Sequence, residues 1–391
     1  MPESNVPRRI LHSVPFFAPH FGGVADRCYQ LTKVLAGQGH DITILTTDYQ
    51  LSLPYAASLD PVKVVPVRSH GGRFRYCPAV KPWLEENIGC FDICHLMNHY
   101  SYINLAVADA CRRRRIPYLF SAMGSMPVMH RSFLKKRLFN RLVGYRLILG
   151  ATGLVAITRQ EARQYLDYHP GIDPARVFVL PNAIDDTYDE SVDPGAFYRR
   201  LGIPERFRLV LYVGRLDHIK GPDLLVQAFA RVAQDFPEAA LALVGPDFGA
   251  RETVRRLIKT NGLGDRVFLC GPLYGGEKLE AYAAADILAV PSRRENMSIV
   301  ALEAAVWKVP VVISETAGFP EVADSGAGRV VRPEIDDIAR ALLDLLLDEP
   351  GRRGMAENAR RMVLDNYLWE KIGKRFDGLM GDLLDERTPV A

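Results

Sequence analysis

The sequence predicts an α/β protein made of two doubly wound domains in tandem. Short apolar segments with strand-like patterns alternate with amphipathic helical segments, which is typical of βαβ units. This alternation occurs twice, before and after an acidic and irregular segment at residues 186–205. The chain has 391 residues, of which 48% are apolar and 24% charged, so it holds enough apolar material for two cores of ordinary size.

The first series of βα units predicts a domain over residues 1–185. A helical segment follows the first strand and carries Val24, Leu31, Val34 and Leu35 at helical spacing. The strand-like segments of this series are residues 8–14, 41–47, 63–67, 91–96, 117–122, 153–158 and 176–185.

The second series predicts a domain over residues 206–365, with residues 186–205 as the linker between the two. Its strand-like segments are residues 208–216, 240–245, 266–271, 286–292, 309–314 and 328–331. Two similar domains in tandem leave a cleft between them. We expect residues 366–391 to carry a helix, over about 365–384, that packs back onto the first domain through the apolar face formed by Leu368, Ile372, Phe376, Leu379 and Leu383.

Membrane spans and metal clusters are not expected. No apolar segment reaches the roughly 18 to 20 residues that cross a bilayer. The apolar run after Arg8 and Arg9 has no small-residue cleavage site behind it, so we interpret it as the first strand of a cytoplasmic protein. Cys94 and His95 lie in one strand-like segment, where neighbours point to opposite faces. We therefore expect the cysteines to be buried thiols and expect no metal site.

Charge is distributed unevenly along the chain. Residues 1–184 contain 22 Lys and Arg against 12 Asp and Glu, whereas the remainder contains 27 against 34, for a net charge of +3. The basic excess favours one domain that meets an anionic partner and not a nucleic-acid-binding surface. Cations interleave with apolar residues at 130–150, the pattern of a helix on an anionic membrane surface; a helix packed on its own sheet with a solvated basic face fits equally well.

Two glutamates lie between the fourth and fifth strands of the second series. Glu295 falls in the loop after the strand and Glu303 on the helix that follows, which Asn296, Met297 and Ser298 open. Helix N-termini present unpaired N–H groups, and carboxylates accept bonds from hydroxyls, so this arrangement suits a sugar nucleotide. The alternative is that Glu295 caps the helix and Glu303 is a solvated side chain.

Two cations mark a second loop of the same domain. Gly214 ends a strand, Arg215 follows it, and Lys220 with Gly221 precedes Pro222 at a helix start. A strand-to-helix loop can turn both cations toward one diphosphate, and the alternative is a pair of solvated surface cations.

A glycine pair follows the first strand of the first domain. Gly22 and Gly23 allow a backbone to approach a phosphate or sugar closely, although a plain tight turn is the alternative. The GxGxxG pattern of a dinucleotide site is absent.

With these segments in place, the sequence resembles the retaining glycosyltransferases of the GT-B fold, family 4 type. The likeness covers nearly the whole chain and is most specific over residues 209–332. The segments that carry it are residues 18–47, PNAID at 181–185, GRLDHIKG at 214–221, and residues 295–328 from the first glutamate to the end of ETAGFPEVADSGAG.

The resemblance implies two Rossmann-like domains facing each other across a cleft, with a C-terminal helix crossing back. It implies a UDP- or GDP-linked sugar donor and, because no DxD motif occurs, no metal or other cofactor. Arg215 and Lys220 would bind the diphosphate, Glu295 the sugar and Glu303 the ribose. Further donor contacts are implied for Gly22, Gly23, Gly214, Asn296, Met297, Ser298 and Ile299, and for the backbone from Cys270 to Leu273 at the base.

On the acceptor side the sequence departs from the family pattern. Met97 and Met123 stand where polar groups are usual, and Trp307 with Lys308 stands where a small residue and Gly are usual. Candidates for the acceptor site are Asn98, His99, Tyr100, Gly124 and His130. A structural role is the alternative for each histidine.

We therefore expect a hexosyltransferase that acts with retention on a glycan or lipid-linked acceptor in polysaccharide or glycolipid synthesis. Two other classes stay open: a nucleotide-sugar epimerase of similar fold and a non-catalytic nucleotide-sugar-binding subunit.

Overall fold

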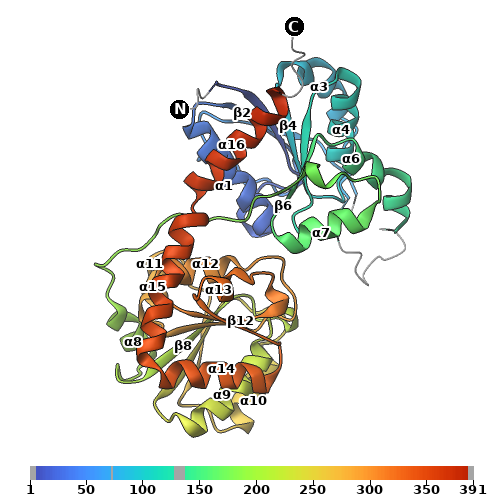
Figure 1. The fold of residues 1–391 in the computed structure, drawn as a ribbon. Coiled ribbons are helices and arrows are strands. Elements are labelled where there is room, and N and C mark those ends of the chain that lie inside the picture. The colour runs from blue at the N-terminus through green and yellow to red at the C-terminus, as the bar shows by residue number, and fades with distance from the viewer. Residues whose placement is uncertain (1–5, 72–73, 127–136, 386–391) are drawn as a thin grey trace. The chain divides into compact units, whose positions relative to one another are not determined.

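The computed structural model describes residues 6–71, 74–126 and 137–385, which form two compact units (Figure 1). Unit 1 comprises Met1–Asn182 and Trp369–Ala391, and unit 2 comprises Ala183–Leu368. The segment expected as a linker, 186–205, belongs to unit 2 and includes helix α8 (Pro194–Leu201), which packs on α11 (Gly276–Ala284).

Unit 1 is built on a seven-stranded parallel sheet in the order β3-β2-β1-β4-β5-β6-β7. Its strands are β1 (Arg9–Ser13), β2 (Asp41–Thr47), β3 (Lys63–Val67), β4 (Ile93–Met97), β5 (Tyr118–Ser121), β6 (Gly153–Ala156) and β7 (Val177–Val179). The strand order reverses between β1 and β4. In such sheets ligands bind beyond the carboxyl ends of the strands at this reversal.

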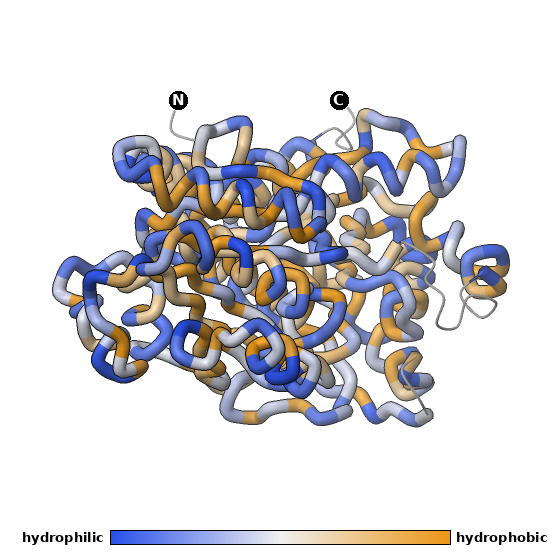
Figure 2. Tube along the Cα trace, turned by 90° about the horizontal axis from the view of Figure 1, so that it is seen from below, coloured by the Kyte–Doolittle hydropathy of each residue, from blue (hydrophilic) through white to orange (hydrophobic). Residues whose placement is uncertain are grey.

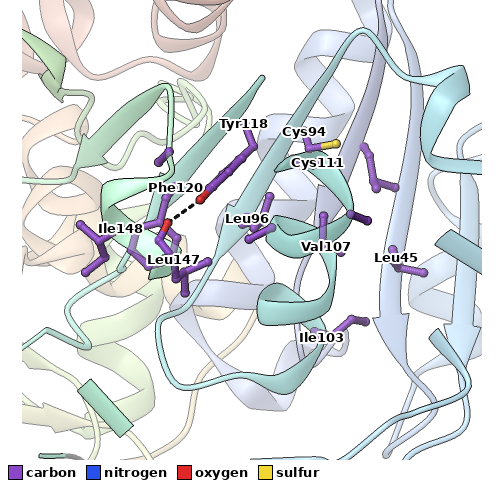
Figure 3. Packing of buried hydrophobic residues seen from close by; sticks show 14 of the residues in the cluster. Leu45, Cys94, Leu96, Ile103, Val107, Cys111, Tyr118, Phe120, Leu147 and Ile148 are labelled. Carbon is purple, nitrogen blue, oxygen red and sulfur yellow. Dashed lines mark hydrogen bonds between the residues drawn. The ribbon is translucent and has the colours of Figure 1, made fainter. Parts of the chain in front are cut away.

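Helices cover both faces of this sheet. They are α1 (Gly23–Gly37), α2 (Leu53–Ala57), α3 (Val80–Asn87), α4 (Tyr102–Arg114), α6 (Tyr145–Leu149), α7 (Arg159–Tyr168) and α16 (Trp369–Asp385). Figure 3 shows the core between the central strands and α4 and α6, where the Tyr118 hydroxyl donates a 2.8 Å hydrogen bond to the Leu147 carbonyl. Burial of Tyr118 therefore leaves its polar atom satisfied.

Unit 2 is built on a six-stranded parallel sheet in the order β10-β9-β8-β11-β12-β13. Its strands are β8 (Arg208–Val213), β9 (Ala239–Val244), β10 (Val267–Gly271), β11 (Ile287–Val290), β12 (Val311–Ser314) and β13 (Gly328–Val331). Its further helices are α9 (Pro222–Asp235), α10 (Arg251–Thr260), α12 (Ile299–Val306), α13 (Glu321–Asp324), α14 (Ile335–Leu347) and α15 (Glu349–Asn366). The predicted α/β class with two parallel sheets is confirmed.

The end of the chain differs in detail from the expected helix over 365–384. α15 ends at Asn366 and α16 begins at Trp369, so Leu368 lies outside the helical face assigned to it. Leu368 instead forms a parallel β-bridge with Ile184. α16 packs on α1, while Ile372, Phe376, Leu379 and Leu383 are buried as expected.

Many of the helices alternate hydrophilic and hydrophobic residues along their length, as Figure 2 shows, whereas α12 is almost entirely apolar. Within residues 6–71, 74–126 and 137–385, no helix has the length and apolar character needed to cross a bilayer. Cys28, Cys77, Cys94 and Cys111 are buried free thiols. The expectation of burial is wrong for Cys90, which is exposed in the turn before β4, and Cys270 is only partly buried.

Candidate functional site

The loops that follow β8 and β11 are fastened to each other. Arg293 makes two hydrogen bonds with the Asp223 carboxylate, at 2.8 and 2.7 Å, and donates its backbone N–H to the Ile219 carbonyl at 2.8 Å. Burial alone would raise the pKa of Asp223, but the hydrogen bonds and charge of Arg293 outweigh it and lower that pKa. The loop that carries Lys220 is thereby held against the loop that carries Glu295.

Lys220 and Glu295 meet in this structure. Lys220 Nζ lies 2.6 Å from Glu295 Oε1, and the two side chains are only 23% and 15% exposed. Glu295 Oε2 accepts a hydrogen bond from the Ser292 hydroxyl at 3.1 Å, and its backbone N–H donates to the Thr316 carbonyl at 2.9 Å. Each charge is therefore neutralised by the other.

Arg215 is positioned by two residues that the sequence did not single out. Its guanidinium lies 3.1 Å from Asp217 Oδ2 and over the ring of Phe248, 5.0 Å from the centroid. The other Asp217 oxygen, Oδ1, accepts the backbone N–H of Lys220 at 2.9 Å. One carboxylate thus connects both cations of GRLDHIKG, and its position between them in the sequence is the signal that could have identified it.

The N-terminus of α12 adds polar groups beside this pair. Ser298 is fully buried as the N-cap residue but makes no capping bond; its hydroxyl and the Asn296 side-chain amide nitrogen have no hydrogen-bond partner among the described residues. Met297 is buried, and Ile299 is the first residue of the helix. Buried polar groups are normally paired, so these atoms are available to a ligand.

Glu303, one turn into α12, is held by α11. Lys278 Nζ lies 2.7 Å from its carboxylate, and the Tyr282 hydroxyl donates to Oε2 at 2.6 Å. Glu303 is 26% exposed, so it is not a freely solvated side chain. Lys278 and Tyr282, spaced four residues apart on a helix, were not predicted.

The remaining donor candidates of unit 2 lie at the ends of β8 and β10. Gly214 directly follows β8 and donates its N–H to the Val244 carbonyl at 2.9 Å. Cys270 lies in β10, and burial raises the pKa of its thiol to about 11, so it stays protonated at neutral pH. Leu273 is partly buried in the next loop, beside Tyr274, whose side chain is 74% exposed.

In unit 1, the glycine pair marks the start of α1. Gly22 has φ of +75° and Gly23 opens the helix; both are exposed, with open space where a Cβ would stand. The pair therefore leaves the helix N-terminus uncovered by side chains at this point.

The acceptor candidates of unit 1 follow β4 and β5. Asn98 has φ of +83°, and Tyr100 is partly buried. His99 is fully buried among Tyr100, Phe120, Phe139 and Tyr168, with Nε2 3.0 Å from Asn140 Oδ1, so its ring does not face solvent. Gly124, at φ of +75°, donates its N–H to buried Glu161 at 2.5 Å. His130 lies outside the described residues.

The candidate site thus comprises two cations and one acid in the loops that follow unit 2 strands and a second acid, Glu303, in the first turns of α12. Cations suit a diphosphate, and carboxylates suit hydroxyls. Lys220 contacts Glu295 directly, whereas Arg215 and Glu303 engage other partners. The described part of the chain contains no cluster of three or more His, Cys, Asp or Glu suited to a metal ion.

Two family models match the chain. The model described as glycosyl transferases group 1 matches residues 196–362, and the model described as glycosyl transferase 4-like domain matches residues 22–183. A D-inositol 3-phosphate glycosyltransferase of Stackebrandtia nassauensis is 32% identical over 419 aligned residues, which cover 98% of this chain and 93% of that relative.

Solved structures also resemble the chain. Anabaena Alr3699/HepE in complex with UDP has a TM-score of 0.80 at 19% identity, covering 96% of this chain and 100% of its own. Sucrose-phosphate synthase from Thermosynechococcus elongatus has a TM-score of 0.72 at 22% identity, and the alignment covers 97% of this chain and 100% of the synthase chain. At these identities the likeness shows the shared fold.

Proposed function

Because this chain belongs to the group 1 glycosyltransferases of the GT4 type, with the GT-B fold, we propose that it moves a sugar from a nucleotide diphosphate to a hydroxyl of a glycan or lipid-linked acceptor. The observation that carries the proposal is the 2.6 Å contact between Lys220 and Glu295, next to Asp217, which pairs with Arg215 and accepts the Lys220 backbone N–H. A donor would place its diphosphate on the cations and its sugar hydroxyls on the acid.

In the proposed reaction, the acceptor hydroxyl attacks the anomeric carbon on the face from which the diphosphate departs. The bond from that carbon to the diphosphate oxygen breaks, and the hydroxyl proton passes to an oxygen of the leaving phosphate. The configuration of the sugar is retained. Arg215 and Lys220 would stabilise the charge that develops on the leaving group, which is the role that otherwise falls to a metal ion.

The sugar, ribose and base of the donor would bind along the loops and helix starts of unit 2. Glu295 and the backbone amides from Asn296 to Ile299 would hold the sugar, and the unpartnered Ser298 hydroxyl supports this placement. Glu303 would accept bonds from the ribose, and the backbone from Cys270 to Leu273 would face the base. The neighbour solved with UDP makes a uridine nucleotide the first donor to test.

For the acceptor we propose a site at the strand ends of unit 1 near Asn98 and Gly124, and for Gly22 and Gly23 at the start of α1 we propose contact with a phosphate. Aromatic rings suited to the apolar face of a sugar lie at the start of α4: Tyr76 is 52% exposed, and its ring centroid is 4.8 Å from that of Tyr102. The relative named for D-inositol 3-phosphate supplies a second acceptor to assay. Product formation from UDP-sugars with that acceptor and with a lipid-linked glycan distinguishes the two.

Replacing Lys220 by Ala tests whether its charge stabilises the leaving diphosphate. We expect kcat to fall by about two to three powers of ten, because Lys220 would act on charge that develops in the transition state. Lys259→Ala, which removes an exposed cation of α10, is the control and should leave turnover unchanged. A change confined to donor affinity would favour a binding subunit, and an isomerised sugar formed from donor alone would favour an epimerase.

We also propose that unit 1 works at an anionic membrane surface. Leu138 and Leu142 are 57% and 59% exposed, next to exposed Arg137 and Arg141, on a helix whose opposite side is buried. Apolar groups beside cations, with no acid between residues 137 and 150, suit anionic lipid headgroups.

Sedimentation with phosphatidylglycerol vesicles tests this surface. The Arg137→Gln/Arg141→Gln variant should lose most binding, whereas Arg255→Gln/Arg256→Gln, an exposed pair on α10, should keep it. Equal binding by both variants would contradict the proposal. Cations at Lys135 and Lys136, which belong to the same sequence pattern, lie outside the described residues.

A further inference from the structure

The Glu303 carboxylate is held by two side chains of α11. Lys278 Nζ lies 2.7 Å from both of its oxygens, and the Tyr282 hydroxyl donates to Oε2 at 2.6 Å. Lys278 and Tyr282 are four residues apart, so they share one face of their helix. This three-residue group, which we call the Glu303 cluster, connects α11 with α12 on the same side as the donor loops.

The two α11 residues differ in their exposure. Tyr282 is 1% exposed, and burial, followed by the Glu303 charge, raises the pKa of its phenol well above the ordinary value. The phenol therefore remains a hydrogen-bond donor and is inaccessible to a ligand. Lys278 and Glu303 are 28% and 26% exposed, so a ligand can reach both.

Lys278 and Glu303 can each make further hydrogen bonds. A lysine ammonium has three N–H donors, and an ionised carboxylate has about four acceptor positions, so neither group is saturated by the contacts described. A hydroxyl is both donor and acceptor. An adjacent cation and carboxylate can therefore bind a diol by accepting from its hydroxyls and donating to them.

We propose that Lys278 and Glu303 together bind the ribose diol of the donor, and that Tyr282 is a positioning residue that orients Glu303. This inference rests on the proposed ribose role of Glu303 and adds two residues to it. Truncating Lys278 removes a donor to the diol, whereas removing the Tyr282 hydroxyl frees the carboxylate to rotate.

The test measures how strongly the protein distinguishes ribose from its dideoxy form. Calorimetric titration with UDP and with 2′,3′-dideoxy-UDP gives a ratio of dissociation constants, and GDP with its dideoxy form serves if GDP binds more tightly. We expect the wild-type ratio to be about tenfold to a hundredfold, because hydrogen bonds to charged groups are lost. Tyr282→Phe and Lys278→Met should each lower the ratio about threefold to tenfold, with little change for the dideoxy ligand.

Controls separate this inference from the assignment it rests on. Glu280→Gln, on the same helix but paired with Arg200 at 2.7 Å, should keep the wild-type ratio, and Lys278→Arg should retain more of it than Lys278→Met. An unchanged ratio in Glu303→Ala, or no binding of either nucleotide, would overturn the ribose role itself. If Glu303→Ala abolishes the ratio while Tyr282→Phe and Lys278→Met preserve it, the α11 residues only join two helices and our inference is wrong.

Discussion

Three glycines of unit 2 set how closely the backbone segments of the candidate donor site approach each other. Gly221, Gly245 and Gly318 have φ of +70°, +147° and +70°. A Cβ at these positions would lie 2.2 Å from the Pro291 carbonyl oxygen, 1.9 Å from that of Gly214 and 2.0 Å from that of Asn296, respectively. Only glycine permits both the backbone conformation and the contact.

Replacing Gly221 by Ala tests this requirement. Gly202 has nearly the same φ, +68°, but open space around it, so Gly202→Ala is a matched control. We expect Gly202→Ala to cost about 1 kcal/mol from backbone strain, and Gly221→Ala to cost at least about 3 kcal/mol, because the Pro291 carbonyl must also move. Urea denaturation measures both, and equal losses would show that the close approach carries no cost.

Two residues that depart from the family pattern, Trp307 and Lys308, contact residues 187 and 188, shortly after the chain enters unit 2. Trp307 donates its indole N–H to the Thr187 hydroxyl at 3.1 Å. Lys308 adopts φ of +59°, where glycine is usual, and lies 5.5 Å from the ring centroid of Tyr188. Both departures therefore affect how residues 187 and 188 are held within unit 2.

Among the elements, α16 shows how one small residue admits a helix. Gly373 faces α1, and a Cβ there would lie 2.3 Å from Val34 Cγ1, whereas Gly378 of the same helix has open space. The helix therefore docks through a site where its backbone comes close to its neighbour.

The two glycines predict opposite effects on stability. Gly373→Ala should destabilise unit 1 by about 1–3 kcal/mol, because the methyl group overpacks the contact with α1. Gly378→Ala should stabilise it by about 0.5–1 kcal/mol, because alanine is the better helix former. Thermal denaturation checks both signs, and stabilisation by both variants would mean that α16 is not closely packed at Gly373.

Neighbouring strands of unit 1 contain a buried histidine pair. His12 on β1 and His95 on β4 are opposite each other in register, with ring centroids 5.4 Å apart. His12 Nδ1 lies 2.7 Å from the Thr32 hydroxyl of α1, and His95 packs 4.9 Å from the ring of Phe376 on α16. The pair lies between the sheet and these two helices.

This pair predicts loss of stability in acid. Burial lowers the pKa of His12 to about 3, against about 6.5 in an unfolded chain, so the unfolded state binds more protons between these values and stability falls as pH drops below about 6.5. At pH 5 the loss from His12 is about 2 kcal/mol relative to pH 7. Burial also lowers the pKa of His95, which adds in the same direction.

Urea denaturation at pH 7 and pH 5 measures the effect. Between pH 7 and pH 5 the free energy of unfolding should fall by about 2 kcal/mol less in His12→Asn than in the wild type. His20→Asn, at an exposed site, is the control and should keep the wild-type fall. A His12→Asn variant with unchanged pH dependence would contradict the prediction.

At the scale of the whole molecule, the charged candidates are confined to one unit. Arg215, Lys220, Glu295 and Glu303 all belong to unit 2, whereas the glycine pair and the acceptor candidates belong to unit 1. Each unit has its own sheet and core. Binding of a nucleotide should therefore stabilise mainly unit 2.

Calorimetry with UDP tests this division. We expect two unfolding transitions, of which the one lowered by Gly221→Ala belongs to unit 2. UDP at about a hundred times its dissociation constant should raise that transition by about 5–10 °C, and Lys220→Ala should reduce the shift. A shift confined to the other transition would show that the nucleotide binds chiefly to unit 1.

Sequence patterns were sufficient to predict the strands and helices, and they placed the candidate site residues in the strand-to-helix segments of unit 2. Alternation of apolar strands and amphipathic helices predicted both sheets, because a parallel sheet needs a crossover after every strand. Position at the carboxyl end of a strand singled out Lys220 and Glu295, since the ends of neighbouring parallel strands meet at one edge. Pattern did not predict the burial of His99, which depends on aromatic residues from distant segments.

The amino-acid sequence by itself determined the two-unit α/β architecture and singled out the four charged candidates for a donor site, because periodicity and position in a strand-to-helix unit are local properties. The tertiary structure alone decided how those residues are paired: Lys220 with Glu295, Arg215 with Asp217, and Glu303 with Lys278 and Tyr282. Hydrogen bonds and ion pairs act over about 3 Å, and which groups come that close is set by packing between loops and helices.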